Sequence, residues 1–313
     1  MRNAFAKAIT ELAGEDEEIV LLAGDIGNRM FDEFQEKFPT RFYNCGIAEA
    51  GMTGLAAGLA ACGMKPVTYT ITPFNTLRCI EQIRNDVCYP NLPVVIVGTG
   101  YGLSYAGLGA THHSMEDIAV MRILPNMQVI CPGDPVEVTL AIKAAMKSKS
   151  PSYIRLGKKG EKTVHQSCPD FVIGKAITIK DSANIMLISV GNVLPVLKSC
   201  LDKFTSLNID AGLISMHTVK PLDAILIKKL MDACKLVVVV EEHNLAAGAG
   251  SAILELCNKA LINARKLLIV SGGDTFLSGC GTQEEARYDL GITVESIVEK
   301  SINHMEKLNE NRV

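Results

Sequence analysis

The feature of this sequence that most constrains its fold is a regular alternation of short apolar runs with longer segments of helical period. The short runs are rich in β-branched residues, as strands buried on both faces of a parallel sheet are. The first half of the chain contains six such runs: Ile19–Ala23, Phe42–Cys45, Val67–Ile71, Val94–Gly98, Gln128–Cys131 and Tyr153–Leu156. Helical segments fall between them at Arg2–Ala13, Glu49–Cys62, Asn75–Cys88 and Pro135–Lys147. The alternation predicts an α/β fold in which helices flank a largely parallel sheet.

A polar stretch from Gly157 to Pro169 interrupts this alternation and predicts a linker between domains. A second series of strands follows it, at Ile185–Val190, Ala211–Met216, Leu236–Glu241 and Leu267–Ser271. The helices of this series fall at Leu194–Phe204, Leu222–Ala233, Ala249–Asn263 and Val294–Lys307. Because 48% of the 313 residues are hydrophobic, the chain can bury two cores. We therefore expect two α/β domains, at residues 1–165 and 172–313.

Composition and charge exclude several classes of function. A formal net charge of −3 leaves no basic surface of the kind that binds nucleic acid. No apolar stretch is long enough to cross a bilayer, and the segment Met1–Lys7 has no signal core, so we expect a cytoplasmic protein without membrane contact. None of the ten cysteines belongs to a C-x-x-C pair, and most lie within apolar runs. This pattern indicates buried, reduced thiols rather than disulfides or a zinc site.

Common nucleotide-binding and metal-binding motifs are missing from the sequence. Neither G-x-G-x-x-G after a strand nor G-x-x-x-x-G-K-[ST] occurs. The glycine-rich stretch Gly98–Gly102 follows a strand, but no helix begins where a bound phosphate would need one. We interpret this stretch as an active-site loop; a binding site for another nucleotide is the less favoured alternative. No H-E-x-x-H motif and no closely spaced His/Cys set occurs, so we expect no metal ligands on this chain.

The most informative segment is Gly46–Met52, with the sequence G-I-A-E-A-G-M. Its glutamate, Glu49, lies at a predicted junction between a strand and a helix. The helix that follows is rich in small residues, which let a helix pack closely against another element: Gly54, Ala56, Ala57, Gly58 and Ala60. A carboxylate at the first turn of a helix is also explained by the helix dipole alone. The segment therefore becomes specific only together with its neighbours.

In that context the sequence resembles the transketolase family, which includes 1-deoxyxylulose-5-phosphate synthases and the beta subunits of 2-oxo acid dehydrogenases. The G-I-A-E motif is similar to that of the family's pyrimidine-binding domain. The resemblance implies thiamine diphosphate as the cofactor, with Gly46 and Ile47 in its binding segment and Glu49 bonded to the aminopyrimidine ring nitrogen. A carboxyl group at that nitrogen shifts the ring toward its imino tautomer. The exocyclic nitrogen can then take the proton from the thiazolium carbon.

The segment after the third strand extends the resemblance. Thr70–Phe74, Arg78 and Glu81–Arg84 are similar to a family pattern in which an aromatic residue is followed by R-x-x-[ED]-Q-I-R. The resemblance implies that Phe74 stacks on the aminopyrimidine and that Arg78 belongs to the same cofactor-binding segment. An aromatic plane suits this task because stacking fixes the orientation of a ring. A core phenylalanine at the start of a helix is the alternative.

The loop Gly107–Asp117 resembles the family's G-x-T-H loop, whose histidine faces the substrate's oxygen atoms. His112 takes that position, and an imidazole there can donate a hydrogen bond to a developing oxyanion. The neighbouring His113 fits either substrate binding or a turn held by side-chain bonds. Leu108 stands where ordinary transketolases carry an aspartate that reads the donor's hydroxyl groups. A 2-oxo acid donor that loses carbon dioxide is therefore an alternative to a ketose phosphate.

Two basic residues resemble the acceptor-phosphate ligands of deoxyxylulose-phosphate synthases. They are Arg122, after the histidine loop, and Lys158, at the end of the last strand of the first domain. A lysine at this second position keeps the positive charge but not the bidentate fork of an arginine. For Lys158 and Lys159, a solvated linker fits equally well.

The second half of the chain resembles the transketolase C-terminal domain, which mainly builds the dimer in that family. The resemblance rests on Met216–Asp223, Val238–Asn244 and Gly248–Ser251, and it implies structural roles for Glu242 and His243. The chain lacks the G-D-G motif and spaced asparagine that hold the metal of the cofactor's diphosphate. We therefore expect a partner subunit that supplies this site, with Mg²⁺ or Ca²⁺, in an α2β2 heterotetramer with a β–β contact through the C-terminal domain.

The resemblance implies a transferase that moves a two-carbon ketol or acyl unit to an aldehyde or ketone acceptor, with Glu49 and His112 as catalytic residues. A decarboxylating synthase and a 2-oxo acid dehydrogenase beta-type subunit are alternatives with the same cofactor. A non-catalytic assembly subunit is a different kind of alternative. The presence of Glu49, Phe74 and His112 argues against it, because a decaying site should lose its glutamate early.

Overall fold

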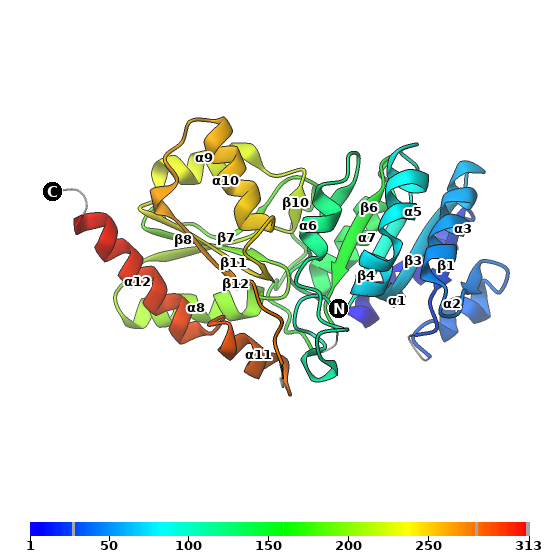
Figure 1. Cartoon of the computed structure of the whole chain (residues 1–313), viewed down its shortest axis with the longest axis horizontal. Coiled ribbons are helices and arrows are strands. Elements are labelled where there is room, and N and C mark those ends of the chain that lie inside the picture. Colours follow the sequence, from blue (N-terminus) through cyan, green and yellow to red (C-terminus); the bar gives the residue numbers. More distant parts are fainter. Residues whose placement is uncertain (27–28, 159, 279–280, 311–313) are drawn as a thin grey trace.

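The computed structural model describes residues 1–26, 29–158, 160–278 and 281–310. Within them the chain forms two α/β domains that lie side by side, each a sheet with helices on both faces (Figure 1). The first sheet has seven strands in the order β10-β5-β6-β4-β3-β1-β2. Six of them come from the first half of the chain: β1 Ile19–Ala23, β2 Phe42–Asn44, β3 Lys65–Ile71, β4 Val95–Thr99, β5 Gln128–Ile130 and β6 Ser152–Leu156. These six pair in parallel, as the alternation of apolar runs predicts.

Helices cover both faces of the first sheet. One face packs on α1, α2 and α7, through side chains such as Phe5, Phe34 and Val138. The other face packs on α3, the segment after β3, and α6, through side chains such as Met52 and Ile118. Their bounds are α1 Arg2–Glu15, α2 Asp32–Lys37, α3 Glu49–Ala61, α6 Asp117–Arg122 and α7 Pro135–Ala145. Because helices cover both faces, the strands are buried throughout, which explains their continuous apolar runs.

The predicted continuous helix at 75–88 is wrong. The structure divides this segment into four short pieces: α4 Thr72–Asn75, η1 Leu77–Cys79, α5 Ile80–Gln82 and the π-helix η2 Ile83–Cys88. Asn75 and Thr76 break the regular ladder because their side chains bond elsewhere. The Asn75 amide donates to Val97 O, and the Thr76 hydroxyl donates to Thr72 O at 2.7 Å. The Thr76 bond is local and competes with the helical pattern, whereas the Asn75 bond reaches across to β4.

The second sheet has five strands in the order β12-β11-β8-β9-β7. Its strands are β7 Ile177–Lys180, β8 Ile185–Val190, β9 Ala211–Ser215, β11 Leu236–Asn244 and β12 Leu267–Gly272. All pairings are parallel except that of β7 with β9. The surrounding helices are α8 Leu194–Ser206, α9 Ala224–Ala233, α10 Ala249–Lys259, η4 Ala264–Lys266, α11 Gln283–Asp289 and α12 Val294–Glu310. This domain confirms the predicted second α/β series.

Several short elements are not predicted by the sequence pattern: α2, α6, α11, β7 and β10. The last of these, β10 (Thr218–Lys220), belongs to the second half of the chain but pairs antiparallel with β5 in the first sheet. The Lys220 ammonium also donates to the carbonyls of Arg122 and Leu124, near the end of α6. These contacts tie the second half of the chain to the sheet of the first.

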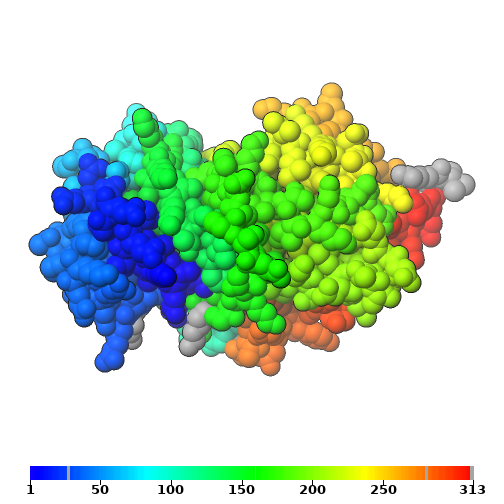
Figure 2. Space-filling model, turned by 180° about the vertical axis from the view of Figure 1, so that it is seen from behind, coloured from blue at the N-terminus to red at the C-terminus, as the bar shows by residue number. Residues whose placement is uncertain are grey.

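The linker is anchored at single points, although many of its described residues are exposed. The backbone amides of Val164 and His165 donate to the Asp134 carboxylate at 2.8 and 3.0 Å. Phe171 stacks on the His217 ring with centroids 3.8 Å apart. Lys159 lies outside the described residues. Seen from behind, the green segment that contains the linker lies across the middle of the molecule, where the two domains meet (Figure 2).

Among the described residues no helix is both long enough and apolar enough to cross a membrane. The same residues contain no group of acidic, cysteine and histidine side chains that could hold a metal ion. Six of the nine described cysteines are buried, whereas Cys62 and Cys168 are exposed. Cys280, the tenth, lies outside the described residues.

Candidate active site

The predicted glutamate lies at the carboxyl edge of the first sheet. Gly46 follows β2 with a positive φ of 67°, and α3 begins at Glu49 three residues later. The Glu49 side chain is only 4% exposed, and its Oε2 accepts a hydrogen bond from Arg78 Nη1 at 2.6 Å. In the described part of the chain, Oε1 has no hydrogen-bond partner. A nearly dry carboxylate with one free oxygen is suited to bond a ring nitrogen.

The surroundings of that free oxygen fit a planar ring with polar edges. The Thr70 hydroxyl is buried and lacks a hydrogen-bond partner among the described residues. A Cβ on Gly24 would lie 2.8 Å from this hydroxyl and 3.8 Å from Glu49 Oε1. Glycine at position 24 therefore keeps the space beside both oxygens open. Buried hydroxyls are rarely left unpaired, so Thr70 is a natural ligand for a bound polar group.

Arg78 joins Glu49 to the predicted stacking residue. Its guanidinium carbon lies 4.3 Å from the centroid of the Phe74 ring, and its Nη1 holds the Glu49 carboxylate. The arginine side chain is 43% exposed, so one side of the pair faces solvent. Both residues come from the irregular segment after β3, where α4 and η1 replace the predicted helix. The broken helix therefore places Phe74 and Arg78 together beside Glu49.

The histidine loop reaches the same place from β4. The His112 ring meets the edge of Phe74 with centroids 5.3 Å apart and lies 6.3 Å from the Tyr105 ring. Its Nδ1 is 3.0 Å from the Thr111 hydroxyl. Tyr105 folds back over Gly100, where a Cβ would lie 1.8 Å from the tyrosine ring. The loop therefore brings an imidazole and a phenol to the edge of the Phe74 ring.

Lys158 completes a continuous row of side chains. Its ammonium lies 5.1 Å from the centroid of the Tyr105 ring, and its backbone carbonyl accepts a hydrogen bond from Arg2 Nε at 2.9 Å. The row formed by these contacts runs along the carboxyl edge of the first sheet through Glu49, Arg78, Phe74, His112, Tyr105 and Lys158. Residues from four separate parts of the sequence thus meet at one edge, where α/β sheets bind their ligands.

Other predicted site residues lie differently. Arg122 forms a bidentate pair with Glu255 of α10, with its Nη1 3.0 Å from Oε1, and has no contact with the row. His113 is buried and bonds Ala106 O through Nε2 at 3.1 Å, so it closes its own loop. Ile47 is 83% exposed, beside the Gly46 turn. The roles predicted for Arg122, His113, Ile47 and Gly46 stay predictions.

Three residues of the site were not singled out from the sequence: Gly24, Thr70 as a ligand, and Tyr105. Gly24 directly follows the first strand, a position at which loops of α/β sheets approach ligands. Tyr105 lies between the glycine-rich stretch and the G-x-T-H loop. Its place in the site could be predicted only by considering the two motifs as one loop. Nothing in the local sequence marks Thr70.

Comparisons with known proteins match both halves of the chain. Residues 1–161 match the family model of the transketolase pyrimidine-binding domain, and residues 174–297 match that of the transketolase C-terminal domain. A putative transketolase C-terminal section of Methanocaldococcus jannaschii is 34% identical over 310 residues, which are 98% of this chain and 96% of that protein. One of the subunits of the apulose-4-phosphate transketolase of Actinobacillus succinogenes is 34% identical over 272 residues, or 86% of each chain.

Longer proteins and a solved structure match as well. A 1-deoxy-D-xylulose-5-phosphate synthase of Geobacter metallireducens is 31% identical over 302 residues, which cover 94% of this chain but 47% of that enzyme. A solved structure described as a split gene transketolase, inactive beta4 tetramer, superposes with a TM-score of 0.87 at 31% identity over 97% of both chains. The chain therefore belongs to the transketolase family, as a pyrimidine-binding domain followed by a transketolase C-terminal domain.

Proposed function

We propose that this chain is the pyrimidine-binding subunit of a transketolase-like transferase that uses thiamine diphosphate and moves a two-carbon ketol or acyl unit to an aldehyde or ketone. The observation that carries the proposal is the Glu49 carboxylate. It is nearly dry, and Arg78 holds one of its oxygens. The other oxygen and the Thr70 hydroxyl, which has no partner among the described residues, both lie within 4 Å of the position that a Cβ on Gly24 would take. When bound, the cofactor supplies a nucleophilic carbon for the donor carbonyl.

Glu49 and Arg78 serve the pyrimidine ring in this proposal. Burial keeps water away from the Glu49 carboxyl group, which strengthens its bond to a ring nitrogen and lets it share a proton there. Arg78 fixes the orientation of the carboxyl plane through Oε2 and leaves Oε1 for the ring. Phe74 offers its face for stacking, with Arg78 on one side of the ring.

The residues farther along the row serve the substrates. His112 can donate a hydrogen bond to a donor oxygen, because in the described structure only its Nδ1 is engaged, with Thr111. Lys158 adds a positive charge at the far end of the row, which favours an acceptor that carries a phosphate or another anionic group. The relatives include transketolase subunits named for apulose 4-phosphate and for 6-deoxy-6-sulfo-D-fructose, both of which are sugars with an anionic group.

A partner subunit is the third part of the proposal. The outer face of α3 carries Gly51, Gly54 and Gly58, at each of which an added Cβ would meet no atom within 4 Å. Leu55, between them, is 46% exposed. This flat face beside Glu49 suits close packing against a chain that holds the diphosphate and its Mg²⁺ or Ca²⁺. Several relatives are named as subunits or sections, and the solved relative is described as an inactive tetramer of beta chains, which supports an α2β2 enzyme.

A decarboxylating synthase with a 2-oxo acid donor is the second candidate, and one observation favours it. Leu108 is 55% exposed in the loop that carries His112, at the position where the resemblance expects a donor-reading aspartate. The matches to 1-deoxy-D-xylulose-5-phosphate synthases point the same way. Carbon dioxide release from pyruvate, compared with turnover of a ketose phosphate, distinguishes the two.

The test is Glu49→Gln in the protein purified with the subunit that accompanies it from its own cells. Turnover should fall by about 10²- to 10⁴-fold, the usual contribution of a positioned acid or base. Thiamine diphosphate binding, measured by calorimetry, should weaken. Glu36→Gln, an exposed glutamate of α2, is the matched control and should leave both unchanged.

Two results would contradict the proposal. Near-normal turnover of the Glu49→Gln enzyme would remove the catalytic assignment of this residue. A chain that purifies alone and binds no thiamine diphosphate would favour the non-catalytic assembly subunit.

A further inference from the structure

The segment from Tyr101 to Ser114, here called the His112 loop, forms a closed unit. Its ends are joined by two backbone hydrogen bonds, from Gly102 N to Ser114 O at 2.9 Å and from Ser114 N to Gly102 O at 3.0 Å. Inside the loop, His113 Nε2 lies 3.1 Å from Ala106 O. A unit closed in this way transmits a shift at its base to Tyr105 and His112 near its tip.

The C-terminal domain holds the base of this loop through Glu242, at the end of β11. The fully buried Glu242 carboxylate accepts a hydrogen bond from Leu103 N at 2.9 Å, across 139 residues of sequence. A Cβ on Gly102 would lie 2.5 Å from Glu242 Oε2, so the loop approaches the carboxylate as closely as glycine permits. Gln283 and Arg287 of α11 bond the same carboxylate and balance its charge.

Two further contacts join the loop to the same domain. Leu103, Ala106 and Met115 form a small buried apolar cluster with Ala286 of α11. Asn192, which follows β8, donates from its backbone amide to the Tyr101 hydroxyl, and its side chain reaches the Ser104 hydroxyl at 3.4 Å. The α11 helix and Asn192 after β8 thus add contacts to the loop from the same domain.

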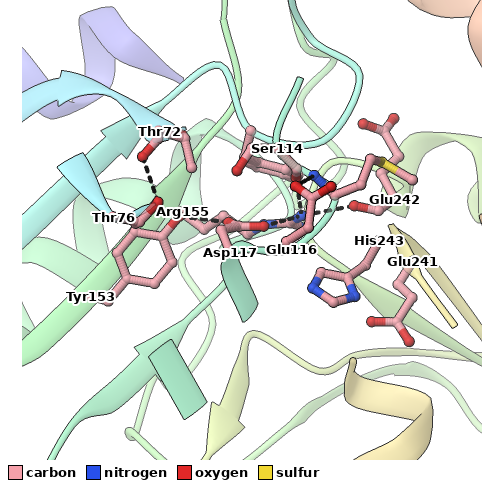
Figure 3. A network of polar contacts seen from close by, with 12 residues as sticks. Thr72, Thr76, Ser114, Glu116, Asp117, Tyr153, Arg155, Glu241, Glu242 and His243 are labelled. Carbon is pink, nitrogen blue, oxygen red and sulfur yellow. Dashed lines mark hydrogen bonds and ion pairs between the residues drawn. The ribbon is translucent and has the colours of Figure 1, made fainter. Parts of the chain in front are cut away.

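Arg155 closes the arrangement from the first domain (Figure 3). Its guanidinium bonds Asp117 through Nε at 2.6 Å, and its Nη2 donates to Ser114 O and to Glu242 O. The guanidinium carbon also lies 3.9 Å from the centroid of the Tyr101 ring. Both ends of the loop therefore contact a buried side chain that also touches the backbone of Glu242.

The neighbouring residue Glu241 provides an internal comparison. Glu241 and Glu242 are adjacent on β11, and both are fully buried. Glu241 accepts hydrogen bonds from Ala249 N and Gly250 N at the start of α10, within its own domain. In Figure 3 it lies apart from the dashed contacts around Arg155. Of these two carboxylates, only Glu242 bonds the His112 loop.

We propose that Glu242 is a positioning residue, which sets the placement of Tyr105 and His112 against Phe74 from the C-terminal domain without touching any of the three. Hydrogen bonds to a buried carboxylate are strong and directional, so they fix a loop more narrowly than apolar packing does. The effect on the loop follows from the contacts alone. The effect on turnover rests on the proposed function.

The test compares Glu242→Ala, Glu242→Gln and Glu241→Ala in the protein purified with its accompanying subunit. Hydrogen–deuterium exchange, followed by mass spectrometry, should show the segment 100–116 exchanging at least about 10-fold faster in Glu242→Ala, because an amide bond and its buried acceptor are lost. The segment 44–62 around Glu49 should be unchanged. Glu242→Gln keeps one carbonyl acceptor for Leu103 N and should restore part of the protection.

Kinetics supply the second readout. Turnover of Glu242→Ala should fall by about 10- to 100-fold, the usual cost of misplacing a reacting group by about 1 Å. The KM values and the affinity for thiamine diphosphate should stay within about two-fold, because a positioning residue acts on kcat. Glu241→Ala should loosen segment 245–255 and leave loop exchange and turnover as in the wild type.

Equal loop exchange in Glu242→Ala and the wild type would overturn the proposal, as would an equal increase in Glu241→Ala. If the wild-type protein shows no turnover, the proposed function fails while the exchange comparison still decides the role of Glu242. If Glu242→Ala does not fold, Glu242→Gln carries the test, because it keeps an acceptor for Leu103 N but removes the charge that Arg287 balances. Its loop should exchange faster than that of the wild type, and unchanged exchange there would equally overturn the proposal.

Discussion

The two sheets end in carboxyl edges of the same kind, but these edges have opposite surroundings. At the edge of the first sheet, Arg78 is 43% exposed, and the Thr70 hydroxyl beside Glu49 has no described partner. At the edge of the second sheet, Glu241 and Glu242 are fully buried against α10, α11 and the His112 loop. One edge is open to a ligand, and the other is closed against the first domain.

The difference shows how one α/β geometry serves two purposes in a single chain. Parallel strands deliver loop residues to one edge in both domains, and ligands bind at such edges when they are open. Here the closed edge supports the loop that brings His112 to the open one. Charged residues at the open edge should therefore matter for activity, and those at the closed edge for stability and loop placement.

The largest stability effect is expected where the closed edge meets the first domain, for Arg155→Met in β6. The Arg155 guanidinium is fully buried and holds Asp117 through two bonds, of 2.6 and 2.8 Å. Removing it leaves a buried carboxylate with only the Tyr153 hydroxyl, so the free energy of unfolding should fall by about 3–5 kcal/mol. Glu49→Gln at the open edge should change it by less than about 1 kcal/mol, because water can reach Arg78. Urea denaturation followed by circular dichroism measures both.

A double variant serves as the control. Arg155→Met combined with Asp117→Asn removes both charges and should recover part of the lost free energy, since no unpaired charge remains buried. Equal losses for Glu49→Gln and Arg155→Met would show that the two edges do not differ in the way described.

The next effect concerns pH, and it arises at His217, which follows β9 on the closed edge. Burial lowers the pKa of His217 to about 4, against 6.5 in an unfolded chain. Between pH 6.5 and about 4, His217 is therefore protonated in the unfolded chain and neutral in the folded chain. The free energy of unfolding should fall between pH 6.5 and about 4, by up to roughly 3 kcal/mol.

His217→Phe keeps a ring for Phe171 to stack on and removes the titration. The loss of stability between pH 7 and pH 5, measured by urea denaturation, should be smaller in this variant than in the wild type. His165 acts with the opposite sign. Burial lowers its pKa, but its bond to Glu137 and the charge of that residue outweigh burial and raise it. The stability that His165 contributes is present at low pH and is lost as pH rises through its folded pKa.

An unchanged dependence of the free energy of unfolding on pH in His217→Phe would refute the assignment of the loss at low pH to His217.

The sequence predicts the sheets well because burial on both faces leaves a long apolar run for each strand. It also predicts Glu49 at a strand-to-helix junction and the start of α7 at Pro135. These features depend on residues that are close together in the sequence. A short segment of the sequence is therefore enough to predict each of them.

Other features depend on contacts in three dimensions that the pattern of the sequence does not show. β10 is three residues long and finds its partner strand in the other domain. The predicted helix after β3 breaks because Asn75 bonds Val97, 22 residues away. The contact between Tyr105 and His112 requires Tyr105 to fold back over Gly100. The bond between Leu103 and Glu242 crosses the domain boundary, so its role in placing the loop becomes visible only in three dimensions.

The smallest effect is expected for Phe74→Leu at the open edge. Leucine keeps most of the apolar contact but loses the aromatic face, so the affinity for thiamine diphosphate should fall by about five- to ten-fold, or about 1 kcal/mol. Phe38 offers a matched control, because Arg41 lies 4.2 Å from its ring centroid in the same arrangement that Arg78 makes with Phe74. Phe38→Leu should leave cofactor affinity unchanged. If calorimetry gives wild-type affinity for Phe74→Leu as well, Phe74 is a packing residue, and the stacking part of the proposed function fails.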